Sequence, residues 1–163
     1  MAPHPCGVYF QDVATDPITG LSAIPYEQAE ELGCFKIDFL HVHVYDHFTS
    51  RAEIKELLKH EPDWGLLEIP SVVAQLFQVS KHHELLNQIK PKSIIELSDC
   101  LALIRPQKRF LLTYYLSNRV KARIDLYKQE PGSGYAFKKG HAISYAMVIV
   151  LQLHLIKFGI KFD

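Results

Sequence analysis

The sequence lacks the features that mark several common protein classes. It has three cysteines, Cys6, Cys34 and Cys100, and no CxxC pair, so neither a disulfide framework nor a zinc ribbon is predicted. It has no Walker A loop, GxGxxG turn, nucleophile elbow or internal repeat. It opens without the basic and apolar stretches of a signal peptide. These absences favour a protein of the reducing cytoplasm.

Long apolar runs are also missing. The longest, residues 142–156, includes Gln152 and His154 and falls short of the ~18 residues needed to cross a bilayer. It predicts a buried helix, and no membrane partner is expected. Because 48% of the residues are hydrophobic, the chain is long and apolar enough to form one domain or two small lobes.

The net charge of zero hides an asymmetry between the two parts of the chain. Residues 1–104 carry seven Lys or Arg and fifteen Asp or Glu, whereas residues 105–163 carry eleven Lys or Arg and three Asp or Glu. Such a division indicates either a polyanionic partner for the basic part or two lobes that attract one another.

Turn and capping signals predict an α+β chain dominated by helices. Two strands are expected near the amino end, at residues 8–10 and 34–40, and residues 16–20 have the chemistry of a turn. Ser50 and Ser93 open capping boxes. The expected helices cover residues 25–33, 50–60, 71–79, 80–89, 93–104, 110–128 and 142–156.

Residues 34–40 alternate with the period of a half-buried strand. Phe35, Ile37 and Phe39 share one face, while Lys36 and Asp38 lie on the other. Burying a lone carboxylate on a core strand destabilises the fold by roughly several kcal/mol unless the carboxylate is paired or binds a metal. Asp38 therefore indicates either a solvated Lys–Asp pair or a functional carboxylate.

Three histidines and an aspartate lie within residues 41–47. If the strand continues, His41 and His43 share the Phe35 face; if a helix begins, His43 and His47 lie one turn apart and could chelate a metal. A small metal-binding enzyme built on this cluster is one hypothesis.

The basic part has two further features. In residues 110–128 a helical stripe is predicted to be core, formed by Phe110, Tyr114, Val120, Ile124 and Tyr127. At the start of the last helix, Lys138, Lys139 and His141 lie at the positive end of the helix dipole, which is unfavourable for cations. They indicate either an anion bound at the helix start or a solvated basic cap.

Five segments together resemble a known family. Residues 4–8 (HPCGV), 35–40 (FKIDFL), 76–80 (LFQVS), 99–106 (DCLALIRP) and 135–146 (YAFKKGHAISYA) are similar, in this order, to RHxxGV, VKFDFLGL, FQxES, ALxRPGP and YxFNKSHAxxYA of the bacterial DNA polymerase III alpha subunit, a family C replicative polymerase. The resemblance implies the end of a palm, residues 1–48, followed by a helical fingers-like region, residues 49–163.

The resemblance also implies roles for individual residues. Asp38 falls on the third catalytic carboxylate of a two-Mg²⁺ site. Lys36, Arg105, Lys139 and His141 fall on positions around the incoming deoxynucleoside triphosphate. Gln78 and Ser80 match the family as well, without an evident role.

The departures from the family are substantial. Its first two catalytic aspartates lie in a PDxDxDF segment, which this sequence lacks, and one carboxylate cannot hold two magnesium ions. The fingers are shortened, His41 replaces a glycine, and Lys138 replaces an asparagine. The chain alone is not expected to polymerise DNA.

Two main hypotheses follow. In the first, a partner polypeptide with the PDxDxDF segment completes a split polymerase on a DNA primer-template, as a bacteriophage genome could encode. In the second, the chain is a non-catalytic module that binds DNA, a nucleotide or the host replicase. Phosphate contacts are then expected from five basic residues, with affinity falling as salt rises: Lys108, Arg109, Arg119, Lys121 and Arg123.

Overall fold

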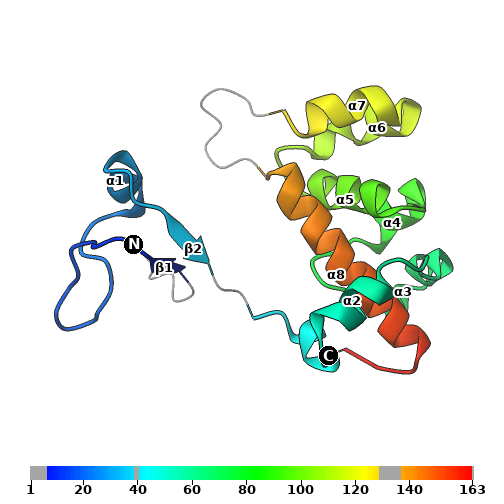
Figure 1. Cartoon of the computed structure of the whole chain (residues 1–163). Coiled ribbons are helices and arrows are strands. Elements are labelled where there is room, and N and C mark those ends of the chain that lie inside the picture. The colour runs from blue at the N-terminus through cyan, green and yellow to red at the C-terminus, as the bar shows by residue number, and fades with distance from the viewer. Residues whose placement is uncertain (1–6, 39–40, 129–136, 163) are drawn as a thin grey trace. The chain divides into compact units, whose positions relative to one another are not determined.

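The computed structural model describes residues 7–38, 41–128 and 137–162, and Figure 1 shows its elements. The chain forms two compact units, the first ending at His43 and the second beginning at Val44. Each unit is described by itself. The described residues are mostly helical with one small sheet, which confirms the predicted α+β class.

The first unit is built on two short strands and one helix. Strands β1, Gly7–Tyr9, and β2, Lys36–Asp38, pair antiparallel, with Val8 opposite Ile37. Helix α1, Tyr26–Glu31, follows Pro25 and ends before Gly33, whose φ of 80° suits glycine. The predicted turn is present, because the Asp16 carboxylate accepts hydrogen bonds from the backbone N–H groups of Ile18 and Thr19.

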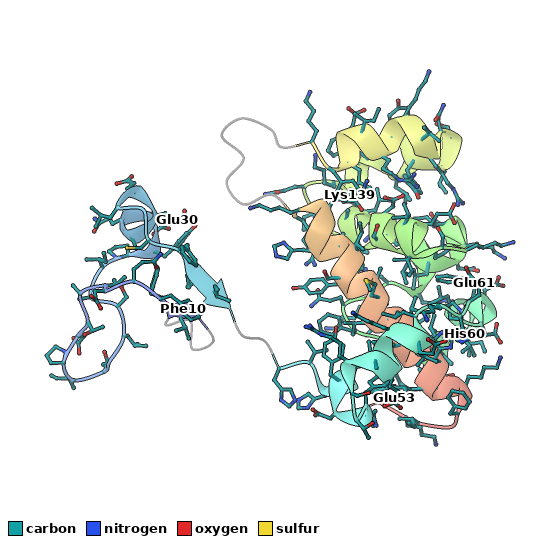
Figure 2. All side chains as sticks on the ribbon, viewed as in Figure 1. Phe10, Glu30, Glu53, His60, Glu61 and Lys139 are labelled. Carbon is teal, nitrogen blue, oxygen red and sulfur yellow. The ribbon has the colours of Figure 1, made fainter. Side chains whose placement is uncertain are left out.

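The apolar face of this sheet is uncovered, contrary to the half-buried pattern expected of β2. Phe35 is 55% and Ile37 is 41% exposed, and Val8 is also exposed. The neighbouring Phe10, labelled in Figure 2, is exposed as well. Lys36, on the other face, is partly buried. Two strands provide no second layer of their own, and none covers this face in the described part of the first unit.

In the second unit, helix α8, Lys139–Lys157, is central (Figure 1). Helix α5, Ile94–Leu103, packs along it, and α7, Arg119–Leu126, packs against α5. The remaining elements are α2, α3, α4 and α6 at Arg51–Leu57, Pro70–Val73, His83–Ile89 and Leu112–Ser117, with short 3₁₀ helices at His43–His47, Trp64–Glu68 and Arg109–Leu111.

Both predicted capping boxes are confirmed. The hydroxyl of Ser50 accepts a hydrogen bond from the Glu53 N–H group, and that of Ser93 accepts one from Glu96, each at 3.2 Å. The Glu96 carboxylate in turn accepts from the N–H group of Lys92 at 2.9 Å. These reciprocal bonds satisfy donors that a helix start leaves free.

Helix α8 is buried as predicted. By length and composition it is apolar enough to cross a membrane, but more than half of its most apolar stretch is buried within the second unit. Its polar side chains there are satisfied. Gln152 accepts a hydrogen bond from the Phe77 N–H group at 2.7 Å and donates one to the Gln75 carbonyl at 3.2 Å.

The single helix predicted for residues 110–128 is wrong. Asn118 interrupts it with an extended φ of −153°, and its side chain accepts from the Lys121 N–H group to cap α7. The buried face also differs from the predicted one. Phe110, Val120 and Ile124, predicted as core, are 76%, 73% and 71% exposed. The residues buried instead are Leu111, Tyr115, Ala122 and Leu126.

Candidate anion-binding site

The predicted site residues fall into two groups. Lys36 and Asp38 lie on β2 in the first unit, while Arg105, Lys139 and His141 lie in the second. Lys36 Nζ is 5.8 Å from the ring centroid of Tyr26. Asp38 is placed by its backbone, opposite Gly7. The structure brings together members of the second group.

Arg105 follows the carboxyl end of α5 and is held by two contacts. Its guanidinium carbon lies 4.3 Å from the ring centroid of Phe137, a cation–π distance. Its Nη2 donates a hydrogen bond to Gln78 Oε1 at 3.2 Å. Gln78 has a φ of 63°, a left-handed conformation that costs on the order of 1 kcal/mol for a residue with a side chain. Gln78, one of the residues that resemble the family motif, thus holds Arg105 in place through this hydrogen bond.

Aromatic rings attach this arginine to the core. The Phe137 ring lies 6.0 Å from that of Tyr145 on α8, and Tyr145 packs edge-on against Phe77 at 5.2 Å. The backbone of Phe77 is held in turn by the buried Gln152 of α8. The Arg105 guanidinium is therefore linked to α8 through Phe137, which precedes that helix and lies against its Tyr145.

Lys139 and His141 occupy the first turn of α8, and both are exposed (Figure 2 labels Lys139). Lys139 Nζ is 5.9 Å from the ring centroid of Tyr127. No described side chain caps this helix start, so its first N–H groups remain available to an anion. Within the described ranges, no carboxylate forms an ion pair with Arg105, Lys139 or His141.

Three of the five residues predicted to contact DNA phosphates have partners inside the unit. Arg119 donates to the Glu96 carboxylate and to the Ile89 carbonyl. Lys108 Nζ donates to the carbonyls of Asp125 and Lys128, both at 2.9 Å. The bonds of Arg119 join α7 to α4 and α5. The bonds of Lys108 join α7 to the segment that precedes the 3₁₀ helix Arg109–Leu111.

The third of these residues, Arg123, belongs to a buried network. Asp99 is fully buried, and its Oδ2 accepts hydrogen bonds from the Tyr115 hydroxyl at 2.7 Å and from Arg123 Nε at 2.8 Å. Burial and this carboxylate raise the pKa of Tyr115, and the hydrogen bond to Asp99 raises the pKa of Arg123. Arg109 and Lys121 are exposed. Their side chains can therefore reach a phosphate without first breaking a hydrogen bond within the described part of the chain.

The histidine cluster is only partly assembled as a metal site. His41, His43 and Asp46 are exposed, and one potential ligand atom of each lies within 4.8 Å of the others. His47, the proposed chelating partner of His43, instead packs edge-on against Phe162 at 5.5 Å. Exposed groups at such distances are common without an ion, so the cluster stays a hypothesis.

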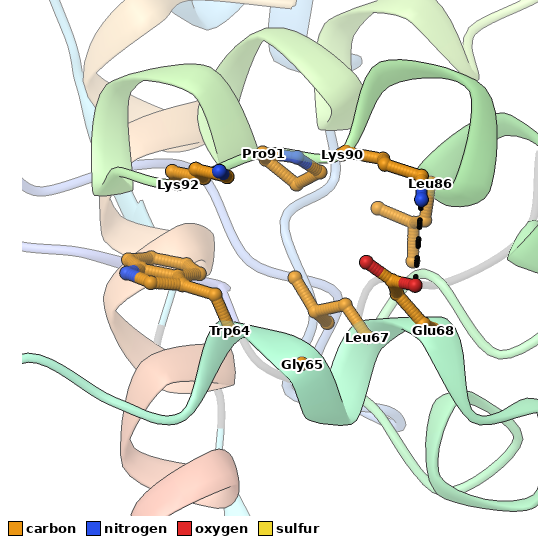
Figure 3. A pocket seen from close by; sticks show the side chains of 8 residues that line it. All are labelled: Trp64, Gly65, Leu67, Glu68, Leu86, Lys90, Pro91 and Lys92. Atoms are coloured by element: carbon orange, nitrogen blue, oxygen red, sulfur yellow. Dashed lines mark hydrogen bonds and ion pairs between the residues drawn. The ribbon is translucent and has the colours of Figure 1, made fainter.

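Two hollows lie elsewhere. One, of about 70 Å³, is lined by Trp64, Pro91 and neighbouring residues, and its Lys90 ammonium pairs with Glu68 at 3.4 Å (Figure 3). It is far smaller than a nucleotide site. The other is an open groove of about 810 Å³ in the first unit, lined in part by Tyr9, Tyr26 and Lys36. Lys36 thus faces a space of nucleotide size.

Comparison of this chain with protein-family models, with curated proteins and with solved structures found no match.

Proposed function

We propose that this chain is a component of a DNA-directed DNA polymerase that is inactive alone. It supplies one catalytic carboxylate, Asp38, and a nucleotide-binding surface to an active site that a partner chain completes. One observation carries the proposal: the Arg105 guanidinium stacks on Phe137, two residues before the uncapped first turn of α8 that holds Lys139 and His141. Among the described residues, no carboxylate pairs with any of the three cationic side chains. The resemblance assigned these same residues to the nucleotide.

The chemistry of this surface fits a triphosphate. A guanidinium presents a planar fork to phosphate oxygens, and an ammonium adds a mobile point charge. The free N–H groups of the helix start favour negative charge. In the first unit, the open groove lined by Lys36 and by the rings of Tyr9 and Tyr26 is a separate surface on which a base and a phosphate could lie.

A two-magnesium site needs carboxylates from a partner chain as well as Asp38. A carboxylate oxygen is a ligand that Mg²⁺ prefers, and the ions would stabilise charge on the transferring phosphoryl group. Asp38 alone cannot hold two ions, so the partner, a chain with a PDxDxDF segment, supplies the other carboxylates. The complex acts on a DNA primer-template in the cytoplasm of a bacterium or of an infected host.

A second candidate is a non-catalytic protein that binds DNA or a nucleotide, or that engages a replicase. The observation that favours it is that the cation group at α8 is complete within this chain and needs no partner side chain. Such a module would bind phosphate without magnesium.

The test is primer extension by the complex recovered with tagged protein from its native source. Wild type, Asp38→Asn and the matched control Asp12→Asn, an exposed carboxylate of the same unit, are compared with and without Mg²⁺. The polymerase proposal expects magnesium-dependent extension that only Asp38→Asn abolishes. Equal extension by all three, or a recovered partner that is itself a complete replicase, would favour the binding module.

A further inference from the structure

The described part of each unit leaves an apolar surface uncovered, and the proposed function explains neither surface. In the sheet of the first unit, Val8 lies directly opposite Ile37. Phe10 and Phe35 lie two residues from them, just beyond the ends of the strands, and side chains two residues apart share a face. All four side chains are exposed. We call this surface the sheet face.

The second surface lies on α6 and α7, which pack together and are fixed to α5 by one buried carboxylate. Tyr115 of α6 and Arg123 of α7 donate hydrogen bonds to the same oxygen of Asp99, at 2.7 and 2.8 Å. Lys108 Nζ donates to the Asp125 carbonyl at 2.9 Å, which holds the segment before α6 against the end of α7. Each helix therefore turns one side toward α5 and exposes the opposite side.

This exposed side carries four apolar side chains, which we call the α6–α7 face. Phe110 and Tyr114 lie four residues apart, in the 3₁₀ helix and in α6, and Val120 and Ile124 lie one turn apart on α7. All four are exposed. Val120 and Ile124 have no ring on which a nucleic-acid base could stack. The α6–α7 face therefore suits a polypeptide better than a nucleic-acid strand.

The two faces belong to parts of the chain with opposite charge. Residues 7–38 hold one Lys or Arg and six Asp or Glu, whereas residues 105–128 hold seven Lys or Arg and one Asp or Glu. Arg109 and Lys121 are exposed directly beside two of the apolar residues of the α6–α7 face. Complementary charge favours contact between unlike surfaces, and like charge disfavours contact between two copies of the same surface.

We propose that this chain associates with a second copy of itself, the sheet face of one molecule covering the α6–α7 face of the other. Burial of the apolar side chains drives the association, and the opposite charges select which surfaces meet. Because the two surfaces differ, the contact is heterologous, so each end of a pair keeps one face to which a further copy can add.

The inference goes beyond the proposed function and does not rest on it. The contact requires neither magnesium, nor a nucleotide, nor a polymerase partner. A failure of primer extension therefore leaves this proposal standing, and a failure of self-association leaves the polymerase proposal standing.

The test is sedimentation of the purified full chain over a wide range of concentration. Wild type is expected to form dimers and larger species at high concentration, and high salt is expected to weaken the association about tenfold by screening the opposite charges. Ile37→Thr and Val120→Thr are each expected to weaken it about fivefold, because each removes apolar area from one face. The matched control Ile18→Thr, an exposed isoleucine in a turn outside both faces, should leave it unchanged.

A mixture of the two variants distinguishes this arrangement from pairing of like surfaces. Ile37→Thr keeps an intact α6–α7 face and Val120→Thr keeps an intact sheet face, so a labelled copy of one should bind the other with wild-type affinity. The mixture should stop mainly at dimers, because the remaining two faces are the altered ones. The proposal is overturned if wild type stays monomeric, if Val120→Thr associates like wild type, or if the mixture binds no better than either variant alone.

Discussion

The Tyr115 hydroxyl lies 2.7 Å from Oδ2 of Asp99, and both side chains are completely buried. Arg123 reaches the same oxygen from α7, so one carboxylate joins α5, α6 and α7. Helices α6 and α7 are thereby fixed to α5, the helix that packs along α8, through a carboxylate that water does not reach.

Removing this carboxylate should be strongly destabilising. Asp99→Asn leaves the Arg123 guanidinium without a counter-charge, and breaking one side of a buried pair costs about 3–5 kcal/mol. Tyr115→Phe should cost less, about 1–2 kcal/mol, because it removes one hydrogen bond. Urea unfolding followed by helical circular dichroism measures both. Asp125→Asn, an exposed carboxylate of α7, is the control, and an equal loss there would contradict the assignment.

Two histidines should make stability depend on pH. Burial is the main cause that lowers the pKa of both His82 and His154. The unfolded chain therefore binds protons before the folded one, so the unfolding free energy falls as pH drops below the ordinary value of 6.5. At higher pH both imidazoles are neutral in the folded and the unfolded chain, so neither makes the unfolding free energy depend on pH. Urea midpoints at pH 7.5, 6.5 and 5.5 test this.

The His154→Gln variant separates the contribution of this residue. Its Nε2 lies 3.2 Å from the His60 carbonyl, and glutamine retains a polar group there. The loss of stability between pH 6.5 and 5.5 should become shallower. An unchanged slope in this variant would show that other groups cause the dependence.

Charge alone should not account for nucleotide binding at Arg105. Arg105→Lys keeps the net charge but loses the hydrogen bond to Gln78, the stacking on Phe137 and the planar fork. We expect affinity for a fluorescent deoxynucleotide to fall about tenfold, equivalent to roughly 1.4 kcal/mol. Lys161→Arg, an exposed conservative change, should leave affinity unchanged. Wild-type affinity in Arg105→Lys would refute a role for the fork.

A polar substitution on the uncovered sheet face should change self-association and leave the free energy of unfolding nearly unchanged. Ile37→Thr keeps the β-branched shape that suits a strand and replaces an exposed apolar group on β2. We expect less self-association in sedimentation experiments and a change in stability within about 0.5 kcal/mol, as for other surface substitutions. A destabilisation above about 2 kcal/mol would instead show that this face is covered in solution.

Local signals in the sequence predicted local structure well. The caps at Ser50 and Ser93 depend on contacts three residues apart, and both were predicted and are present. The apolar run 142–156 was long enough to predict the buried helix α8. In these cases neighbouring residues alone determine the outcome.

Contacts between distant segments were not predicted. Phe110, Val120 and Ile124 were predicted as core, but the chain buries a neighbouring face at Leu111, Tyr115, Ala122 and Leu126. The bond between Gln78 and Arg105 spans 27 residues, which no periodicity reports. The role of Asp99 was not predicted, although its place among apolar residues is a signal, because a buried carboxylate requires a partner. The sequence does not show that this partner is Arg123.

Helix α8 also has a consequence for biosynthesis. The apolar face of α5 is made before the helix that covers it, because α8 follows later in the chain. At ribosomal rates of about 5–20 residues per second, that face waits for roughly several seconds before α8 is available. A nascent-chain chaperone that recognises exposed leucine would therefore find α5 as a temporary ligand on every newly made copy.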